Sequence, residues 1–277
     1  MSKFGFVTCV ELGLSCMKAI YSAGGELSLA ITLKDEQAVE KSGRVYIDEF
    51  CEDRSIKLIK SSHVNNEEVI NSIKQAGIDW LFIIGWSQIA SKELLDTPKK
   101  GVLGIHPTLL PIGRGRAAIP WAILKGLESS GVTMFKLDEG VDTGPILSQI
   151  KIPLDERESA TDLYKKVNRA HISLMEKAVP QLLSGEYKLS IQDESKATEW
   201  PGRKPEDGLI DLNGSVMNAE KLIRAVTHPY PGAFFIKGRK KVIVWSAEMT
   251  DEEPQNCIKF FDGTLKMTDF EVIKFEQ

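Results

Sequence analysis

A nearly unbroken apolar run, Trp80-Leu-Phe-Ile-Ile-Gly-Trp86, constrains the fold of this chain more than any other feature. A strand that is covered on both faces in a parallel sheet has this composition, whereas a half-exposed strand alternates apolar and polar residues. The run is far too short to span a bilayer. It therefore predicts a central strand of a sheet with helices on both sides.

Strand-like and helix-like segments alternate along the chain on either side of this run. We predict strands over 3–9, 27–33, 56–59, 79–85, 102–105, 132–137 and 146–152, and helices over 12–23, 44–53, 66–76, 117–125 and 159–184. Strands that alternate with helices at this pitch are typical of an α/β fold. The sequence predicts a Rossmann-like, doubly wound and mainly parallel sheet.

The composition changes after Gly185, where prolines and glycines begin to punctuate short β-prone runs such as Lys241–Ser246. Such a change is typical of a domain boundary. We predict a catalytic domain over residues 1–190 and a small, mostly β, open barrel-like domain over residues 200–277.

Charge and composition exclude several classes of protein. The 35 Lys and Arg against 39 Asp and Glu give a net charge of −4. Residues 201–277 hold 11 Lys and Arg and 12 Asp and Glu, so this region is not basic either. A protein that binds phosphate backbones is usually basic, so a nucleic-acid partner is disfavoured. Lys3 is followed by Glu11 before a signal sequence develops, and the four cysteines form no CxxC pair. We expect a cytoplasmic protein with reduced thiols and no membrane partner.

Several common enzyme motifs are absent from the sequence. The first predicted strand is followed by Val10-Glu-Leu-Gly-Leu-Ser15, which has one glycine where a dinucleotide site needs three. No Walker A motif, GxSxG elbow or HExxH pair occurs. Dehydrogenases, nucleotide hydrolases, α/β-hydrolases and zinc proteases thus lose their main sequence support.

Three strand ends carry the polar residues that could do chemistry. They are Ile84–Gln88, Ile105–Pro111 with its continuation to Arg116, and Leu137–Gly144. Ligands of open α/β sheets collect beyond the carboxyl ends of the strands. His106 and Asp142 could act there as a general base and the carboxylate that orients it. The alternative is a histidine that only caps a loop.

These segments carry a family resemblance. Gly101–Pro111, Gly131-Val-Thr133 and Asp138-Glu-Gly-Val-Asp-Thr-Gly144 resemble the core of the 10-formyltetrahydrofolate-dependent formyltransferases. This family includes methionyl-tRNA formyltransferase, glycinamide ribonucleotide transformylase and the nucleotide-sugar N-formyltransferases. The resemblance extends from the first strand to about residue 185.

The resemblance implies transfer of a formyl group from N10 of the folate to a primary amine, with no metal. His106 would assist deprotonation of the amine or stabilise the tetrahedral intermediate, and Asp142 would be its partner. N10-formyltetrahydrofolate would be the donor, with its pterin enclosed by two loops. The cofactor-binding residues implied are Gly85, Trp86, Ser87, Ile89, Asp138, Glu139, Gly140 and Val141.

One position departs from the family pattern. The family motif is Asn-x-His, and its Asn donates a hydrogen bond to the developing oxyanion, but here Gly104 occupies that place. Loss of such a donor costs about 10²–10³ in rate. Gln88 is our candidate for a replacement donor, and Ser87 and the Gly104 N–H are alternatives. The departure also leaves open a catalytically silent folate- or sugar-binding protein.

The second domain discriminates among acceptors. Arg203–Asp211, Leu222–Phe234 and Lys241–Trp245 are similar to the region that follows the catalytic domain in nucleotide-sugar formyltransferases. This resemblance implies a UDP- or dTDP-linked amino-dideoxy sugar and a place in glycan biosynthesis, with the pseudaminic-acid or flagellin-glycan branch as one possibility. The substrate-binding residues that we predict are Thr108, Arg114, Arg116 and Arg203. The arginines suit a diphosphate or the folate glutamate tail, or else are solvated.

Three other functions stay open at this point. The acceptor could be methionyl-tRNA or another amine, the protein could be a silent binding module, or water could be the acceptor in hydrolysis of formyl-folate. The sequence does not identify the sugar, the nucleotide or the amine position. A hydrophobic β surface in the second domain is a candidate homodimer contact.

Overall fold

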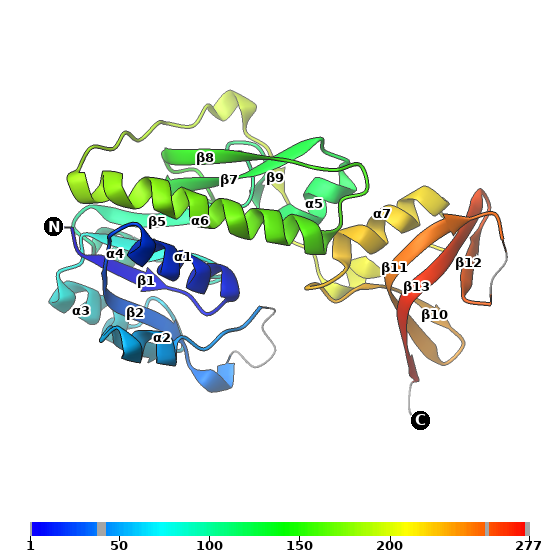
Figure 1. Ribbon diagram of the computed structural model, residues 1–277, viewed down its shortest axis with the longest axis horizontal. Coiled ribbons are helices and arrows are strands. Elements are labelled where there is room, and N and C mark those ends of the chain that lie inside the picture. The colour runs from blue at the N-terminus through cyan, green and yellow to red at the C-terminus, as the bar shows by residue number, and fades with distance from the viewer. Residues whose placement is uncertain (1, 38–42, 253–254, 275–277) are drawn as a thin grey trace. The chain divides into compact units, whose positions relative to one another are not determined.

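The computed structural model describes residues 2–37, 43–252 and 255–274, and the chain forms two compact units (Figure 1). Unit 1 comprises residues 1–115, 131–152 and 166–199, and unit 2 comprises residues 116–130, 153–165 and 200–277. The chain therefore passes between the units several times. The predicted ranges 1–190 and 200–277 instead assumed a single boundary.

Unit 1 is built on a seven-stranded sheet in the order β3-β2-β1-β4-β5-β7-β8. Neighbours from β3 to β5 pair in parallel, and β7 pairs antiparallel with β5. The strands are β1 (Phe4–Val7), β2 (Leu27–Leu33), β3 (Lys57–Ser61), β4 (Trp80–Ile83), β5 (Gly101–His106), β7 (Ser129–Lys136) and β8 (Ile146–Pro153). This order confirms the α/β, doubly wound and mainly parallel fold. The strand order reverses between β1 and β4, where such folds bind ligands.

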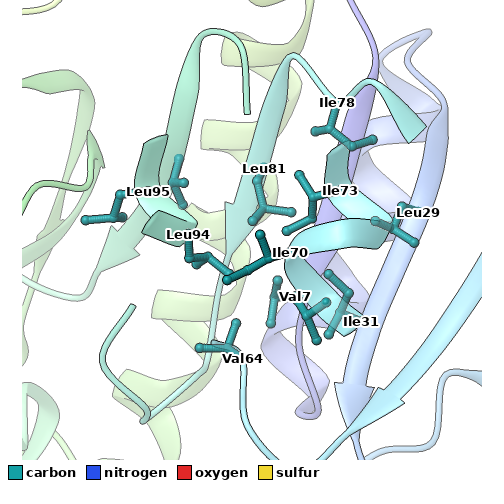
Figure 2. Close-up of a cluster of buried hydrophobic side chains, with 12 residues drawn as sticks. Val7, Leu29, Ile31, Val64, Ile70, Ile73, Ile78, Leu81, Leu94 and Leu95 are labelled. Atoms are coloured by element: carbon teal, nitrogen blue, oxygen red, sulfur yellow. The ribbon is translucent and has the colours of Figure 1, made fainter. Parts of the chain in front are cut away.

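Side chains on the two faces of this sheet belong to different layers of the core, because successive residues of a strand point to opposite faces. On one face, Val7, Leu81 and Val102 pack with α3 (Glu67–Ala76) and α4 (Lys92–Asp96), as Figure 2 shows for most of the cluster. On the other, Phe4 and Phe6 pack on Phe82. The remaining helices are α1 (Glu11–Ser22), α2 (Asp48–Asp53) and α6 (Ala160–Ser184), with the 3₁₀ turns η1 (Asp35–Gln37) and η2 (Glu194–Lys196).

The region around α2 differs from the prediction of a helix over 44–53. Arg44 forms a bridge with Val10, and the N–H of Val45 donates to the carbonyl of Cys9 at 3.1 Å. These extended contacts at the end of β1 prevent a helix there, so α2 begins only at Asp48.

Unit 2 combines two helices with an antiparallel sheet in the order β10-β11-β13-β12. Its helix α7 was missed, although Ala219, Ile223 and Val226 have helical spacing and are buried. The elements are α5 (Ala118–Leu124), η3 (Pro205–Gly208), α7 (Val216–Val226), β10 (Ala233–Lys237), β11 (Lys240–Thr250), β12 (Cys257–Phe260) and β13 (Gly263–Lys274). The short strands β6 (Arg114–Gly115) and β9 (Glu199–Trp200) form a separate ladder.

The four cysteines are free thiols, and three of them are buried. Burial raises the pKa of Cys51 to about 11, which keeps this thiol protonated at neutral pH. Within the described ranges, no helix combines the length and the apolar character needed to cross a membrane.

Candidate active site

The loop after β4 closes against the end of β1, at the point where the strand order reverses. Gly85 has a φ of +67°, and a Cβ there would lie 2.1 Å from Cγ2 of Val10. Only glycine fits this combination of backbone and space. The next residue, Trp86, packs against the buried cluster of Cys9, Val10 and Leu33. Both residues thus anchor the loop in the fold.

Gln88, in the same loop, has its amide engaged at both ends. Its Oε1 accepts from the N–H of Val64 at 2.9 Å, and its Nε2 donates to the carbonyl of Ser62 at 2.9 Å. The side chain joins two loops, which differs from the expected placement as an oxyanion donor. Of its neighbours, Ser87 is exposed and Ile89 is 75% exposed.

His106 and Asp142 come together at the carboxyl end of β5. His106 is buried, with Nδ1 3.4 Å from Oδ2 of Asp142 and Nε2 2.7 Å from the carbonyl oxygen of Gly113. Oδ2 of Asp142 also accepts from the N–H of Gly115 at 2.9 Å. Two residues of one loop, Gly113 and Gly115, therefore hold the two members of the pair.

The two ring nitrogens of His106 each face a hydrogen-bond acceptor. The carbonyl of Gly113 can only accept a hydrogen bond, so Nε2 must carry a proton. Nδ1 faces the carboxylate of Asp142, which is also an acceptor when ionised. The pair can therefore hold a proton and exchange it, as general acid–base chemistry requires.

The space beside Gly104 is filled by Leu137. A Cβ at Gly104 would lie 2.8 Å from Cδ2 and 3.4 Å from Cγ of Leu137. Leu137 also packs on the core cluster of unit 1, which restricts its movement. The family asparagine therefore has no room at this position unless Leu137 shifts.

The loop after β7 borders a cavity of about 580 Å³. Within the loop, Oδ1 of Asp138 accepts from the N–H of Gly140 and the hydroxyl of Thr143, at 3.1 and 2.6 Å. Glu139 lies 3.5 Å from Nζ of Lys92. The cavity is lined by Lys92, Leu95, Asp96, Pro98, Lys99, Lys100, Gly101, Lys136, Leu137, Asp138, Glu139 and Gly140. Of the residues predicted to bind the cofactor, three from this loop line the cavity, namely Asp138, Glu139 and Gly140. The exposed Val141 and the predicted residues of the 85–89 loop do not line it.

Thr108 lies two residues beyond His106 and is buried. Its carbonyl accepts from the hydroxyl of Thr133 at 2.7 Å, whereas its own hydroxyl has no hydrogen-bond partner among the described residues. Buried hydroxyls are usually paired, so an unpaired one next to a reactive histidine is a candidate ligand contact.

Arg114 does not match the expected substrate-binding placement. Its guanidinium is buried, donates to Oε1 of Gln192 at 2.9 and 3.2 Å, and pairs with Glu194 at 2.6 Å. These bonds raise the pKa of Arg114 and lower that of Glu194, as expected for a charge-assisted pair. The donors of Arg114 are used within the chain rather than offered to a diphosphate.

Arg116 is exposed, and Arg203 lies over the ring of Trp121 in unit 2, with one guanidinium N–H of Arg203 donating to the carbonyl of Asp207 at 2.7 Å. Cζ of Arg203 is 5.1 Å from the centre of the Trp121 ring, and Nζ of Lys125 is 5.7 Å from it. A Cβ on Gly202 would lie 3.5 Å from Cδ of Arg116. Neither arginine forms an ion pair in the part of the chain that the structure describes. We call Arg116, Trp121, Lys125 and Arg203 the cationic patch.

Sequence reasoning missed Gln192 and Thr198, in the segment after α6. Both contact the loop between Gly113 and Gly115, or the turn that carries Asp142. The segment 190–198 is mostly polar, and nothing in its sequence indicates that Gln192 is buried. Across the described residues, no group of three or more His, Cys, Asp and Glu side chains could hold a metal ion.

The fold agrees with comparisons to known proteins. Residues 19–179 match the model of the formyl transferase family, and residues 203–272 match the model of the formyl transferase C-terminal domain. The chain therefore belongs to the formyl transferase family. Its membership defines a transferase of formyl groups.

A curated relative is the bifunctional polymyxin resistance protein ArnA of Wigglesworthia glossinidia brevipalpis. It is 31% identical over 241 residues, which are 87% of this chain and 36% of the relative, so the chain spans about a third of that protein's length.

Solved structures share the fold over nearly the whole chain. An N-formyltransferase from Helicobacter canadensis, in complex with folinic acid and dTDP-3-aminofucose, has a TM-score of 0.69 at 19% identity and covers 96% of this chain and 98% of its own. A methionyl-tRNA formyltransferase from Clostridium thermocellum has a TM-score of 0.66 at 19% identity, with coverage of 99% and 100%. Identities this low establish the common fold.

Proposed function

We propose that this protein transfers a formyl group from N10-formyltetrahydrofolate to the primary amine of a UDP- or dTDP-linked amino-dideoxy sugar. It would be a cytoplasmic enzyme of glycan biosynthesis. The observation that carries the proposal is the His106–Asp142 pair, held between the carbonyl of Gly113 and the N–H of Gly115. Family membership supplies the formyl chemistry that such a pair would serve.

In the proposed reaction, the amine nitrogen attacks the formyl carbon and a new C–N bond forms. The nitrogen loses a proton to the Asp142–His106 pair, whose carboxylate accepts it directly or through water. The tetrahedral intermediate then collapses, the bond between the carbon and N10 breaks, and N10 takes up a proton from the pair. The products are the formamide and tetrahydrofolate, and the pair returns to its starting state.

The oxyanion of the intermediate needs a donor, since Gly104 supplies no side chain. We assign this part to the hydroxyl of Thr108, which is buried and has no hydrogen-bond partner within the described residues. Donors that are already in place at a developing charge stabilise it without reorganisation. This assignment replaces Gln88, because the amide of Gln88 is engaged with Ser62 and Val64.

The two ligands would use different groups of the chain. A guanidinium pair next to an indole suits a diphosphate and a flat base, which supports Arg116 and Arg203 as acceptor contacts. The relative from Helicobacter canadensis is complexed with a dTDP-linked amino sugar and with folinic acid, which supports the same pair of ligands here. The 138–140 loop, with its cavity, is the candidate wall of the folate site.

A coupled assay tests the proposal. The purified protein is incubated with N10-formyltetrahydrofolate and a panel of UDP- and dTDP-linked amino sugars, and both tetrahydrofolate release and the mass of the sugar are followed. We expect one sugar to gain one formyl group. Transfer to methionyl-tRNA instead would change the acceptor, formate release without amine would indicate hydrolysis, and folate binding without turnover would indicate a silent module.

A further inference from the structure

We infer that Gln192 is a positioning residue that sets the geometry of the His106–Asp142 pair, with Arg114 and Thr198 as its supports. The inference rests on the proposed function, because it concerns the same reaction. All of these residues lie in unit 1. Gln192 is 5% exposed, and its side chain contacts the backbone carbonyl of Asp142 rather than the carboxylate.

The Gln192 side chain contacts the turn that carries Asp142. Nε2 of Gln192 donates to the carbonyl oxygens of Asp142 and Gly144, both at 2.7 Å. Asp142 has a φ of +55°, a left-handed conformation that residues other than glycine adopt when their surroundings hold them there. The two hydrogen bonds from one amide span this strained turn. Gln192 therefore fixes the direction in which the Asp142 carboxylate points.

Arg114 fixes the orientation of the Gln192 amide. Its Oε1 accepts from Nε and Nη2 of Arg114, at 3.2 and 2.9 Å. Rotation of the amide by half a turn would place its NH₂ group against the guanidinium and its oxygen against two carbonyl oxygens. Because all four contacts would then be repulsive, only one orientation is stable. Glu194 holds Arg114 in turn through two hydrogen bonds of 2.6 and 2.9 Å.

The backbone around Arg114 connects the His106–Asp142 pair to the segment 192–198, which contains Gln192. Oγ1 and the carbonyl of Thr198 accept from the N–H groups of Gly113 and Arg114, both at 2.9 Å. Gly113 holds His106 and Gly115 holds Asp142. Hydrogen bonds thus link His106 through this loop and the 192–198 segment to the Asp142 turn, and the 3.4 Å ion-pair contact between Asp142 and His106 closes the ring.

The ring predicts how a change at Gln192 acts on the reaction. Gln192→Leu removes both bonds to the Asp142 turn, so the carboxylate leaves its place beside His106. We expect kcat to fall about 10–100-fold, as for a displaced catalytic group. The KM values for both substrates should change less than threefold, because the residues proposed to bind them are not in the ring.

A double-mutant cycle with Asp142→Asn tests this mode of action. If Gln192 acts only through Asp142, the double variant has the kcat of Asp142→Asn alone, whereas independent effects multiply. Multiplied effects, or a Gln192→Leu enzyme with normal kcat, would overturn the inference while leaving the proposed function intact. If Asp142→Asn itself retains full activity, the catalytic role of Asp142 and the inference built on it fail, whereas the proposed function fails only if the wild type transfers no formyl group. Should Gln192→Leu not fold, Thr198→Val enters the same cycle.

Gln149→Leu is the matched control. The Nε2 of Gln149 also donates two hydrogen bonds in unit 1, to the carbonyl of Leu110 and the hydroxyl of Thr133, both at 2.8 Å. Its hydrogen bonds within the described part of the chain reach no member of the ring. We expect this variant to lose stability much as Gln192→Leu does, but to keep kcat within threefold. An equal loss of kcat in both variants would show that general loosening, not positioning, causes the effect.

Discussion

The proposed catalytic pair and the cationic patch differ in how their charged groups are held. Around His106 and Asp142, hydrogen bonds from Gly113 and Gly115 fix the reacting groups within the chain. Around Trp121, Arg116 and Arg203 have no carboxylate partner among the described residues, and Arg203 stacks on the indole ring. Groups that react need a fixed geometry before the substrate arrives, whereas groups that bind an anion need unused donors.

Arg114 and Arg116 show how little sequence spacing says about this difference. The two arginines are separated only by Gly115, yet one is buried in an ion pair with Glu194 and the other is exposed. The residue in between, Gly115, donates to Asp142. The backbone N–H that contacts Asp142 and an exposed arginine therefore belong to adjacent residues.

The largest effect on activity is expected when a member of the His106–Asp142 pair is replaced. His106→Ala and Asp142→Asn each remove one member of the pair, and we expect kcat to fall about 10²–10⁴-fold, the range of general acid–base catalysis. Circular dichroism and thermal melts should show a folded protein, since His106 lies at the end of β5 and Asp142 in the loop between β7 and β8. Unfolding of either variant would make the residue structural and contradict the assignment.

Removing an arginine from the cationic patch should weaken substrate binding rather than lower turnover. Arg203→Ala or Arg116→Ala removes a hydrogen bond to a charged group, worth about 1.5–3 kcal/mol, so KM for the nucleotide sugar should rise about 10–100-fold with kcat nearly unchanged. Initial-rate kinetics measures this split. Arg239→Ala, at the exposed turn between β10 and β11, is the control and should leave KM unchanged. A fall in kcat without a rise in KM would refute the binding role.

The space beside Gly104 gives a sharper form of the comparison. Gly104→Asn forces Leu137 out of its place and should cost about 1–3 kcal/mol of unfolding free energy, the usual cost of overpacking. Adding Leu137→Ala should recover part of that stability, because it makes room for the amide. Denaturant titrations of both variants check the prediction. An unchanged stability in Gly104→Asn would show that Leu137 is free to move.

The smallest effect concerns His171, which is buried in α6 with Nδ1 2.8 Å from the carbonyl of Val167. Burial lowers the pKa of His171 to about 4, the hydrogen bond to Val167 opposes this, and the charge of His106 adds to it. The unfolded chain therefore takes up this proton first, so stability is lost as pH falls from about 6.5 towards 4.

The loss should be on the order of 1 kcal/mol per pH unit in that window. Urea unfolding of the wild type and of His171→Leu between pH 7 and 4 measures it, and the variant should show a flatter dependence. Parallel curves for the two proteins would be inconsistent with a neutral, buried His171.

Local patterns predicted much of the fold and part of the site. The apolar run at Trp80–Ile83 identified a central strand, and the glycine-flanked turn around Asp142 identified a partner for His106. Contacts between distant side chains were not predictable in the same way. Gln192 meets Arg114 across 78 residues, and that pairing depends on the path of the chain after α6.

The departures from prediction have the same cause. Gln88 and Arg114 were assigned to ligands because of their chemistry and position in loops. The fold instead gives each of them partners within the chain: Ser62 and Val64 for Gln88, and Glu194 for Arg114. A polar side chain in a strand-end loop becomes a ligand contact only when tertiary structure leaves its donors unused, and sequence does not show this.

The most direct test of the account follows an isotope-labelled formyl group from N10-formyltetrahydrofolate to the acceptor. Wild type and Asp142→Asn are compared at equal concentration, with the nucleotide sugar identified in the panel, and the acceptor is analysed by mass spectrometry. The account predicts one labelled formyl group on the sugar amine with the wild type, and a rate at least 100-fold lower with the variant. Equal labelling by both proteins, or no labelling of any amino sugar by the wild type, would contradict it.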